Sequence, residues 1–264
     1  MSTAAATPTR MTDGEFAHAA ALAERLAGMR FTPDKRPLLI ARLAKHAVGR
    51  GGFGPYLDHV AAEPAAGQAF VEALATHLTR FLREPQHFAL LRSVAADLPA
   101  RARCWSAGCS TGEEAYSMAM MLLEGGGGGA GRDVRVLASD VSRPVLTRAA
   151  AGVYDRAAVK VPRHLLGRYF EPRAGGTVAA GRALRDLVDV RRVNLVGHWP
   201  FGGAMHVVFC RNVMIYLTDA RRRELVGRFA DVLAPGGLLF VGHAETLAGR
   251  GSGLTQVAPG VYRK

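Results

Sequence analysis

A loop of small residues followed by two acidic residues is the first segment whose residue types suit a chemical task. It runs Cys104-Trp-Ser-Ala-Gly-Cys-Ser-Thr-Gly-Glu-Glu114, after an apolar run and before a helical stretch. A strand-to-helix turn of this kind exposes backbone N–H groups, and Gly108 and Gly112 permit close backbone approach. The loop lacks the Gly-Lys-Ser/Thr of a phosphate-binding P-loop. Glu113 and Glu114 suit a cationic ligand, such as a sulfonium nucleotide with an amino group, although acidic residues also simply stabilise helix N-termini.

Further polar residues follow other apolar runs. Asp140 ends the run Val134-Arg-Val-Leu-Ala-Ser-Asp, where a carboxylate can accept both hydroxyls of a ribose. Asn194-Leu195 and Arg211-Asn212 also come after apolar stretches. If these stretches are parallel strands, their carboxyl ends share one edge of a sheet. We therefore expect a nucleoside site at that edge.

The spacing of apolar residues, which predicts the elements that position these side chains, changes near Pro99. Beyond it, short apolar runs alternate with helical stretches, which indicates a mostly parallel sheet. The predicted strands are residues 103–107, 134–139, 207–210 and 238–242, with a helix at 113–124. Residues of about 154–192 are predicted to form a small β-subdomain insert. The last residues, 257–262, are predicted to form a hairpin on the sheet edge.

Residues 11–91 show only helical spacing, with apolar residues three or four apart. We expect an all-α N-terminal domain there, followed by an α/β domain at 92–264. Asp34 is predicted to cap a helix of about 34–50 that has Pro37 in its first turn. Lys35, Arg42, Lys45 and His46 would share one side of that helix. Without further context, this basic side is a solvated face.

Composition narrows the class of protein. The chain has 264 residues, 49% of them hydrophobic, and a net charge of +12, which favours anionic partners. No apolar run is long enough for a membrane helix, and no secretory signal precedes the first domain, so we expect a cytoplasmic protein. The cysteines, Cys104, Cys109 and Cys210, lack Cys-x-x-Cys spacing and are expected to be buried and reduced. No metal site is expected.

Four ordered segments resemble the chemotaxis-receptor glutamate methyltransferases, the CheR family, over nearly the whole chain. They are Leu78-Thr-Arg-Phe-Leu-Arg-Glu-Pro-Gln-His-Phe88, Ala107-Gly-Cys-Ser-Thr-Gly-Glu-Glu-Ala-Tyr-Ser117, Phe209-Cys-Arg-Asn-Val-Met-Ile-Tyr216 and Ala234-Pro-Gly-Gly-Leu-Leu-Phe-Val-Gly-His-Ala-Glu245. The departures are His77 in place of a common Asn, Leu82 for Phe, Ala115 for Pro and Ala244 for Ser.

The resemblance implies a Rossmann-like class I methyltransferase domain that binds S-adenosyl-L-methionine and releases S-adenosyl-L-homocysteine. It also implies that Arg83 and Tyr216 are the catalytic residues. The implied cofactor contacts are His77, Thr79, Arg83, Glu114, Asp140, Asn194, Leu195, Arg211 and Asn212.

The implied reaction is methyl transfer from a sulfonium to a glutamate oxygen. A carboxylate with a pKa near ~4.3 is already a nucleophile at neutral pH, so no general base is needed. Alignment and removal of water supply roughly 7–11 kcal/mol in such a reaction. Arg83 would orient the carboxylate, and the Tyr216 hydroxyl would hydrogen-bond it or line the methyl path. The alternatives are pairing of Arg83 with Glu84 or a helix end, and a core position for Tyr216.

The implied partner is the acidic helical bundle of a methyl-accepting chemotaxis receptor, with Lys35, Arg42 and Lys45 reading its acidic residues. We expect a monomer, no nucleic-acid partner, no membrane insertion, and no docking of a receptor tail on the β-subdomain. Two other functions stay open. A methyltransferase for nucleic-acid amines would usually carry an Asn/Asp-Pro-Pro-aromatic turn where this chain has Arg211-Asn-Val-Met. A non-catalytic cofactor-sensing or scaffolding module would not need Arg83, Asp140 and Tyr216.

Overall fold

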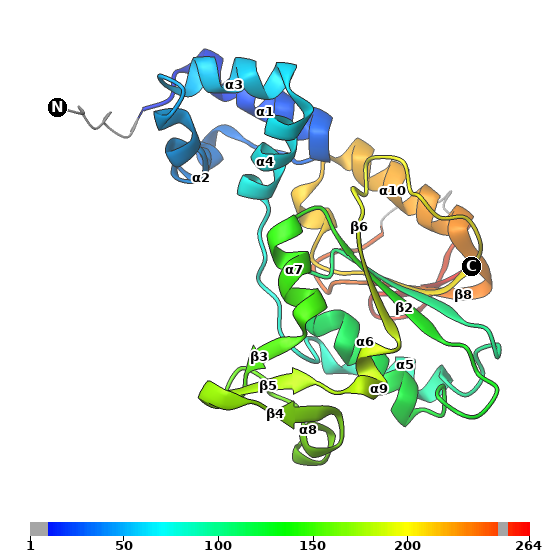
Figure 1. Cartoon of the computed structure of the whole chain (residues 1–264). Helices are drawn as coiled ribbons and strands as arrows, with labels where there is room; N and C mark the ends of the chain where they lie inside the picture. The colour runs from blue at the N-terminus through cyan, green and yellow to red at the C-terminus, as the bar shows by residue number, and fades with distance from the viewer. Residues whose placement is uncertain (1–9, 248–252) are drawn as a thin grey trace. The chain divides into compact units, whose positions relative to one another are not determined.

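The computed structural model describes residues 10–247 and 253–264, and the chain divides into two compact units (Figure 1). Unit 1 contains residues up to Thr76 together with Tyr216–Arg222, and unit 2 contains His77–Ile215 and Arg223–Lys264. The predicted domain boundary at residue 91 therefore lies inside unit 2. The reason is helix α5 (Pro85–Val94), whose Phe88 and Leu91 are buried in the core of unit 2. Over the described ranges, no helix is both long and apolar enough to cross a bilayer.

Unit 1 is helical, as predicted. Its full helices are α1 (Asp13–Ala27), α2 (Arg36–Val48), α3 (Phe53–Ala62) and α4 (Pro64–Leu74). The helix α1 begins with a capping box between Thr12 and Glu15, and Glu15 also accepts a hydrogen bond from the Gly54 backbone N–H at 2.9 Å, which ties α1 to α3. The fully buried side chains Leu39, Leu43, Leu57 and Phe70 fill the space between these helices.

The predicted start of the basic helix is wrong by two residues. Asp34 lies in a 3-10 turn, η1 (Pro33–Lys35), and α2 begins after it at Arg36. A hydrogen bond with the Thr32 side chain lowers the pKa of Asp34, so this carboxylate serves the turn and does not cap α2. Pro37 does fall in the first turn of α2, where its missing N–H costs least.

Unit 2 is built on a seven-stranded sheet with the order β6-β2-β1-β7-β8-β10-β9. The strands β6 (Val188–Arg192), β2 (Arg135–Asp140), β1 (Arg103–Ala107), β7 (Met205–Cys210) and β8 (Leu233–Val241) are all parallel. The hairpin of β9 (Thr255–Ala258) and β10 (Val261–Arg263) closes one edge antiparallel to β8, as predicted. The alternation of strands and helices predicted a mostly parallel sheet, and the family resemblance implied this Rossmann-like arrangement.

Side chains alternate between the two faces of β1. Cys104 belongs to the core shared with α5 and α6 (Glu113–Glu124), whereas Trp105 packs edge-on against Trp199 and against Phe229 of α10 (Asp219–Val232). Because helices cover both faces, the predicted strands read as continuous apolar runs. The helix α7 (Arg143–Ala151) follows β2.

The predicted insert at 154–192 is shorter than expected. A separate antiparallel sheet, β3-β5-β4, is formed by β3 (Val153–Asp155), β4 (Phe170–Pro172) and β5 (Thr177–Ala180), with α8 (Arg163–Tyr169) and the turn η2 (Ala174–Gly176) between them. After the short helix α9 (Arg182–Arg185), the chain returns to the main sheet as β6. This edge strand has mostly exposed or half-buried residues, so its sequence lacks the apolar run of a central strand.

Candidate functional site

The strand order creates a switch point between β1 and β7. From β1 the chain proceeds to β2 and β6 on one side, whereas β7 and β8 extend the sheet on the other side. In open parallel sheets, ligands bind outside the carboxyl ends of the strands at such a point. The loop after β1, Asp140 at the end of β2, and Arg211-Asn212 after β7 all lie at these carboxyl ends.

Gly108 and Gly112 shape the loop between β1 and α6. Both have positive φ, 92° and 98°. A Cβ on Gly108 would lie 2.5 Å from Cγ2 of Val213, and a Cβ on Gly112 would lie 2.9 Å from both Ala149 Cβ and the Tyr154 hydroxyl. The sequence predicted close backbone approach at these glycines. The groups that come close in the structure are side chains of the protein itself.

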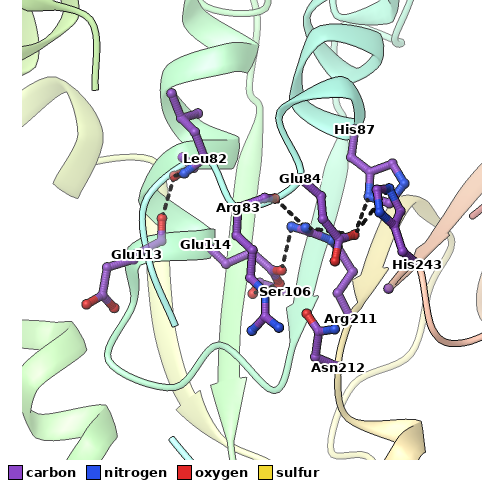
Figure 2. A network of polar contacts seen from close by, with 12 residues as sticks. Leu82, Arg83, Glu84, His87, Ser106, Glu113, Glu114, Arg211, Asn212 and His243 are labelled. Atoms are coloured by element: carbon purple, nitrogen blue, oxygen red, sulfur yellow. Dashed lines mark hydrogen bonds and ion pairs between the residues drawn. The ribbon is translucent and has the colours of Figure 1, made fainter. Parts of the chain in front are cut away.

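Glu114 is a buried carboxylate in the first turn of α6. One oxygen accepts a hydrogen bond from the Ser106 hydroxyl at 2.7 Å, and the other lies 3.1 Å from the Arg211 guanidinium (Figure 2). Desolvation raises the pKa of Glu114, and the charge of Arg211 only partly opposes this shift. A cationic ligand beside this group would stabilise its ionised form.

Arg211 is the centre of the polar network shown in Figure 2. Its side chain is 1% exposed and lies between Glu84, at 3.1 Å, and Glu114, and it also donates to the carbonyl of Arg83. The rings of Phe88 and Phe209 flank the guanidinium at 5.3 and 5.7 Å from their centroids. Arg211, implied by the resemblance as a cofactor contact, is thus engaged by protein groups that link α5, α6 and β7.

Asp140 holds the loop that follows β1. Its two carboxylate oxygens accept the backbone N–H groups of Ser110 and Ser142, each at 3.0 Å. Burial raises the pKa of Asp140, and these two hydrogen bonds act in the opposite direction. Ser110 also donates its hydroxyl to the His77 carbonyl at 3.0 Å, and the charge of His77 lowers the pKa of Asp140, so His77 lies near this carboxylate.

Arg83 lies on a tight turn before α5. Its neighbours Leu82 and Glu84 both have positive φ, 51° and 59°, and the Leu82 N–H donates to the Ser117 hydroxyl of α6 at 3.0 Å. The Arg83 guanidinium donates to the carbonyl of Leu78 at 3.2 Å. Glu84 pairs with Arg211, so the alternative of an Arg83–Glu84 pair is wrong. Thr79, on the same segment, is half-buried.

Asn212 has a left-handed backbone with φ of 59°. Its N–H donates to the buried carboxylate of Glu245 at 2.6 Å, and Glu245 also accepts N–H groups of Gly242 at 2.7 Å and Ile215 at 3.2 Å. Glu245 therefore fixes the turn after β7 from the segment after β8. Glu245 ends the segment 234–245 that resembles the family, and this resemblance is the one sequence signal for its role.

Asn194 and Leu195 follow β6 in a half-buried turn. The Asn194 side chain accepts the Val196 N–H at 3.2 Å. The Leu195 carbonyl accepts hydrogen bonds from Trp199 at 3.2 Å and Arg228 at 2.7 Å. The backbone N–H of Val193 donates to the Asp140 carbonyl at 3.1 Å, so this turn starts beside the end of β2.

Four further predicted site residues belong to unit 1: Lys35, Arg42, Lys45 and Tyr216. Lys35 and Lys45 are exposed. Arg42 is half-buried, and its guanidinium donates to the carbonyls of Ala73 and Ala75 at 3.2 and 2.5 Å, which satisfies the C-terminal end of α4. Tyr216 is 41% exposed, which excludes the alternative of a core aromatic residue.

One cluster of potential metal ligands was not expected from the sequence. Glu84, His87 and His243 each offer a ligand atom, and these atoms lie within 4.8 Å of one another. His87 is buried, Glu84 is half-buried and His243 is exposed. Glu84 and His87 lie in the family-like segment 78–88 and His243 in the segment 234–245, 156 positions after His87, so only the fold brings them together.

The chain is similar to known chemotaxis enzymes over most of its length. Residues 77–260 match the family "CheR methyltransferase, SAM binding domain". The "Chemotaxis protein methyltransferase" of Escherichia coli is 36% identical over 90% of this chain and 86% of its own length, and "Chemotaxis protein methyltransferase 2" of Pseudomonas aeruginosa is 37% identical over 90% and 88%. A solved S-adenosylmethionine-dependent methyltransferase from Mesorhizobium loti is 18% identical, with a TM-score of 0.34, over 60% of this chain and 52% of that one.

Proposed function

Because this chain belongs to the CheR methyltransferase family, we propose that it methylates glutamate side chains of methyl-accepting chemotaxis receptors in the cytoplasm. The chain is an S-adenosylmethionine-dependent methyltransferase with a Rossmann-like class I fold. The observation that carries the proposal is the extent of the likeness, which covers all the strands of the main sheet except β10. That match includes Arg83, Glu114, Asp140 and Asn212.

The residues at the switch point fit the cofactor. Asp140 accepts the backbone N–H groups of Ser110 and Ser142 on different oxygens, and a carboxylate has about four lone-pair sites, so it can also accept ribose hydroxyls. Glu114 is a buried carboxylate whose charge Arg211 only partly offsets, as its raised pKa indicates, and this suits a cationic group. His77, Thr79, Arg83, Asn194, Leu195, Arg211 and Asn212 complete the proposed contacts. The bound cofactor supplies an electrophilic methyl group on a sulfonium.

Arg83 is the proposed catalytic residue in unit 2. The receptor glutamate is ionised at neutral pH and needs no base, so the enzyme's task is to orient it and exclude water. A planar guanidinium can hold one carboxylate oxygen while the other attacks. The turn of Leu82–Glu84, which Ser117 and Arg211 hold in an unfavourable backbone conformation, limits the positions that the Arg83 backbone can adopt. Tyr216, with its exposed ring, is the second proposed residue.

The basic side of α2 is proposed to read the receptor. Lys35 and Lys45 are exposed and carry charges that acidic receptor helices would attract. Arg42 also belongs to this proposal, but its hydrogen bonds to the end of α4 mean that its replacement would disturb unit 1 as well. We further propose that the chain acts as a monomer and that the β3-β5-β4 sheet docks no receptor tail.

The proposal is tested by incubating the chain with methyl-labelled S-adenosylmethionine and receptor-containing membranes. Alkali releases volatile methanol only from carboxyl esters, so base-labile label identifies glutamate methylation. We expect Arg83→Ala to lower kcat about 100-fold or more, because misplacement of a reacting group has an effect of that size. Arg80→Ala, an exposed neighbour on the same segment, should retain activity. Label that is stable to alkali, or equal activity of the two variants, would contradict the proposal.

A further inference from the structure

Glu84, His87 and His243 bring three ligand atoms of different segments to one point. His87 Nδ1 lies 3.4 Å from Glu84 Oε2, and His243 Nε2 lies 3.9 Å from the same oxygen. In a tetrahedral Zn²⁺ site with bonds of about 2.0–2.1 Å, neighbouring ligand atoms are roughly 3.3 Å apart. The cluster therefore needs only small side-chain shifts to reach the geometry of a metal site. Figure 2 shows both imidazole rings turned towards Glu84.

The hydrogen bonding of His87 leaves a lone pair on its Nδ1, which lies beside Glu84. His87 Nε2 lies 3.2 Å from the Pro259 carbonyl, which can only accept, so this nitrogen carries the proton of the neutral ring. The lone pair of Nδ1 then faces Glu84 Oε2, another acceptor. His87 is 1% exposed, and Nδ1 has no hydrogen-bond partner among the described residues.

A histidine that donates its other N–H to a carbonyl is the usual form of a metal-ligating histidine, because that bond fixes the tautomer and the ring orientation. Charge around the cluster also favours a cation. Arg211 is the guanidinium between Glu84 and Glu114, so this one cation faces two carboxylates.

We propose that Glu84, His87 and His243 bind one divalent transition-metal ion, with Zn²⁺ the best match. Two imidazole nitrogens and one carboxylate oxygen suit Zn²⁺ better than Mg²⁺ or Ca²⁺, which prefer oxygen ligands alone. Water completes the coordination. Arg211, 3.1 Å from Glu84 Oε2, orients the ligating carboxylate from its other side. The site is distinct from methyl transfer, since none of its three ligands is a proposed cofactor or catalytic residue.

The ion would have a structural effect on the turn that carries Arg83. It would join the start of α5 to the segment after β8 and so restrain Glu84, which has a left-handed backbone. Gln86 competes for the site, because its side-chain amide contacts His243 Nε2. Gln86 is exposed, so its side chain can turn away or offer its amide oxygen to the ion instead.

The test uses the full chain, purified with chelator and titrated with Zn²⁺ alone in a calorimeter, followed by thermal unfolding with and without the ion. We expect one ion per chain and a rise in Tm, because an ion that binds only the folded state stabilises it. His243→Ala should weaken Zn²⁺ binding at least about 10-fold and abolish the rise in Tm. This side chain is 53% exposed, so the variant is expected to fold. His164→Ala, an exposed histidine of α8, is the matched control and should change neither result.

Substitution of Co²⁺ for Zn²⁺ gives a second readout that needs no variant. Coordination by two imidazoles and a carboxylate predicts visible bands of a four- or five-coordinate Co²⁺ ion, without the near-ultraviolet charge-transfer band of a cysteine thiolate. Absence of binding would overturn the proposal, as would a thiolate band. Equal affinity of wild type and His243→Ala would also overturn it.

Discussion

Arg211 lies buried between two carboxylates, those of Glu84 and Glu114. Its guanidinium is withdrawn from water, and the attraction of Glu84 and Glu114 offsets part of the cost of burying these charges. Arg211 also fixes the position of the turn at Arg83, because its guanidinium donates to the Arg83 carbonyl. The same residue therefore connects the charge of Glu114 to the turn that carries the proposed catalytic group.

Replacement of Arg211 by Met should lower the free energy of unfolding by about 3–5 kcal/mol, since it leaves buried carboxylates without their partner. Urea unfolding measures this change. Arg182→Met is the control, because the Arg182 side chain is 88% exposed in its pair with Asp186 and such pairs contribute about 0–1 kcal/mol. Comparable losses in the two variants would show that the Arg211 network is not energetically special.

The burial of the three cysteines predicts that their thiols are unreactive at mildly alkaline pH. Burial raises the pKa of the Cys104 thiol to about 12 and raises the pKa values of Cys109 and Cys210 well above the ordinary value. The reactive thiolate is thus the disfavoured form of all three cysteines in the folded chain at pH 8. Ellman's reagent should detect no thiol in the native protein at this pH and three in denaturant. Rapid reaction of native protein would contradict this burial.

At the scale of elements, the loop between β1 and α6 is fitted to its neighbours. Gly108 and Cys109 each donate a backbone N–H to the Ser139 carbonyl at 2.8 Å, so the loop is attached to the end of β2. Val213, from the segment after β7, fills the space beside the Gly108 α-carbon. The three strands nearest the switch point are thereby joined at their carboxyl ends by backbone contacts as well as by side chains.

Gly108→Ala should therefore cost more than the positive φ alone, which is of order 1–3 kcal/mol. The new methyl would overlap Val213, shift the loop and weaken cofactor binding, which calorimetry with S-adenosylmethionine measures. Gly131→Ala is the matched control, because Gly131 has a φ of 78° but nothing within 4 Å of an added Cβ. The double variant Gly108→Ala, Val213→Ala should recover part of the affinity. No recovery would show that the overlap with Val213 is not the cause.

The elements that sequence predicted well are those buried on both faces. Cys104 to Ala107 of β1 are all buried, so the strand appears as an apolar run. The edge strand β6 falls within the predicted insert because Asp189, Arg191 and Arg192 are exposed, so its sequence has no apolar run. Sequence spacing likewise placed Asp140, Arg211 and Asn212 at one edge, but it carried no information on what each side chain contacts. The partners of Arg211 and the Glu84, His87 and His243 cluster depend on pairings across distant segments.

At the scale of the whole molecule, a net charge of +12 attracts an acidic partner before the two surfaces touch. Steering of this kind is screened by salt, whereas contacts with buried Asp140 and Glu114 are screened less. Docking of the receptor and binding of the cofactor should consequently respond differently to ionic strength.

We expect kcat/KM for receptor methylation to fall about tenfold or more between about 0.05 and 0.5 M salt, while the Kd of S-adenosylmethionine changes far less. The double variant Lys35→Glu, Lys45→Glu should reduce the low-salt activity and flatten this dependence. Lys160→Glu, an exposed lysine of unit 2, serves as the charge-matched control for one substitution. An unchanged salt slope in the double variant would mean that α2 does not read the receptor.

Unit 1 is not continuous in the chain, and this has a consequence for biosynthesis. Met29 forms a β-bridge with Leu217, the Arg30 N–H donates to the Tyr216 carbonyl at 2.7 Å, and the Thr218 N–H donates to the Gly28 carbonyl at 3.2 Å. A ribosome adds about 5–20 residues per second, so the helices of α1 to α4 emerge several seconds before the segment that completes them. Unit 1 can therefore complete its fold only after most of unit 2 has been synthesised. Its last contacts form when most strands of the sheet have already been translated.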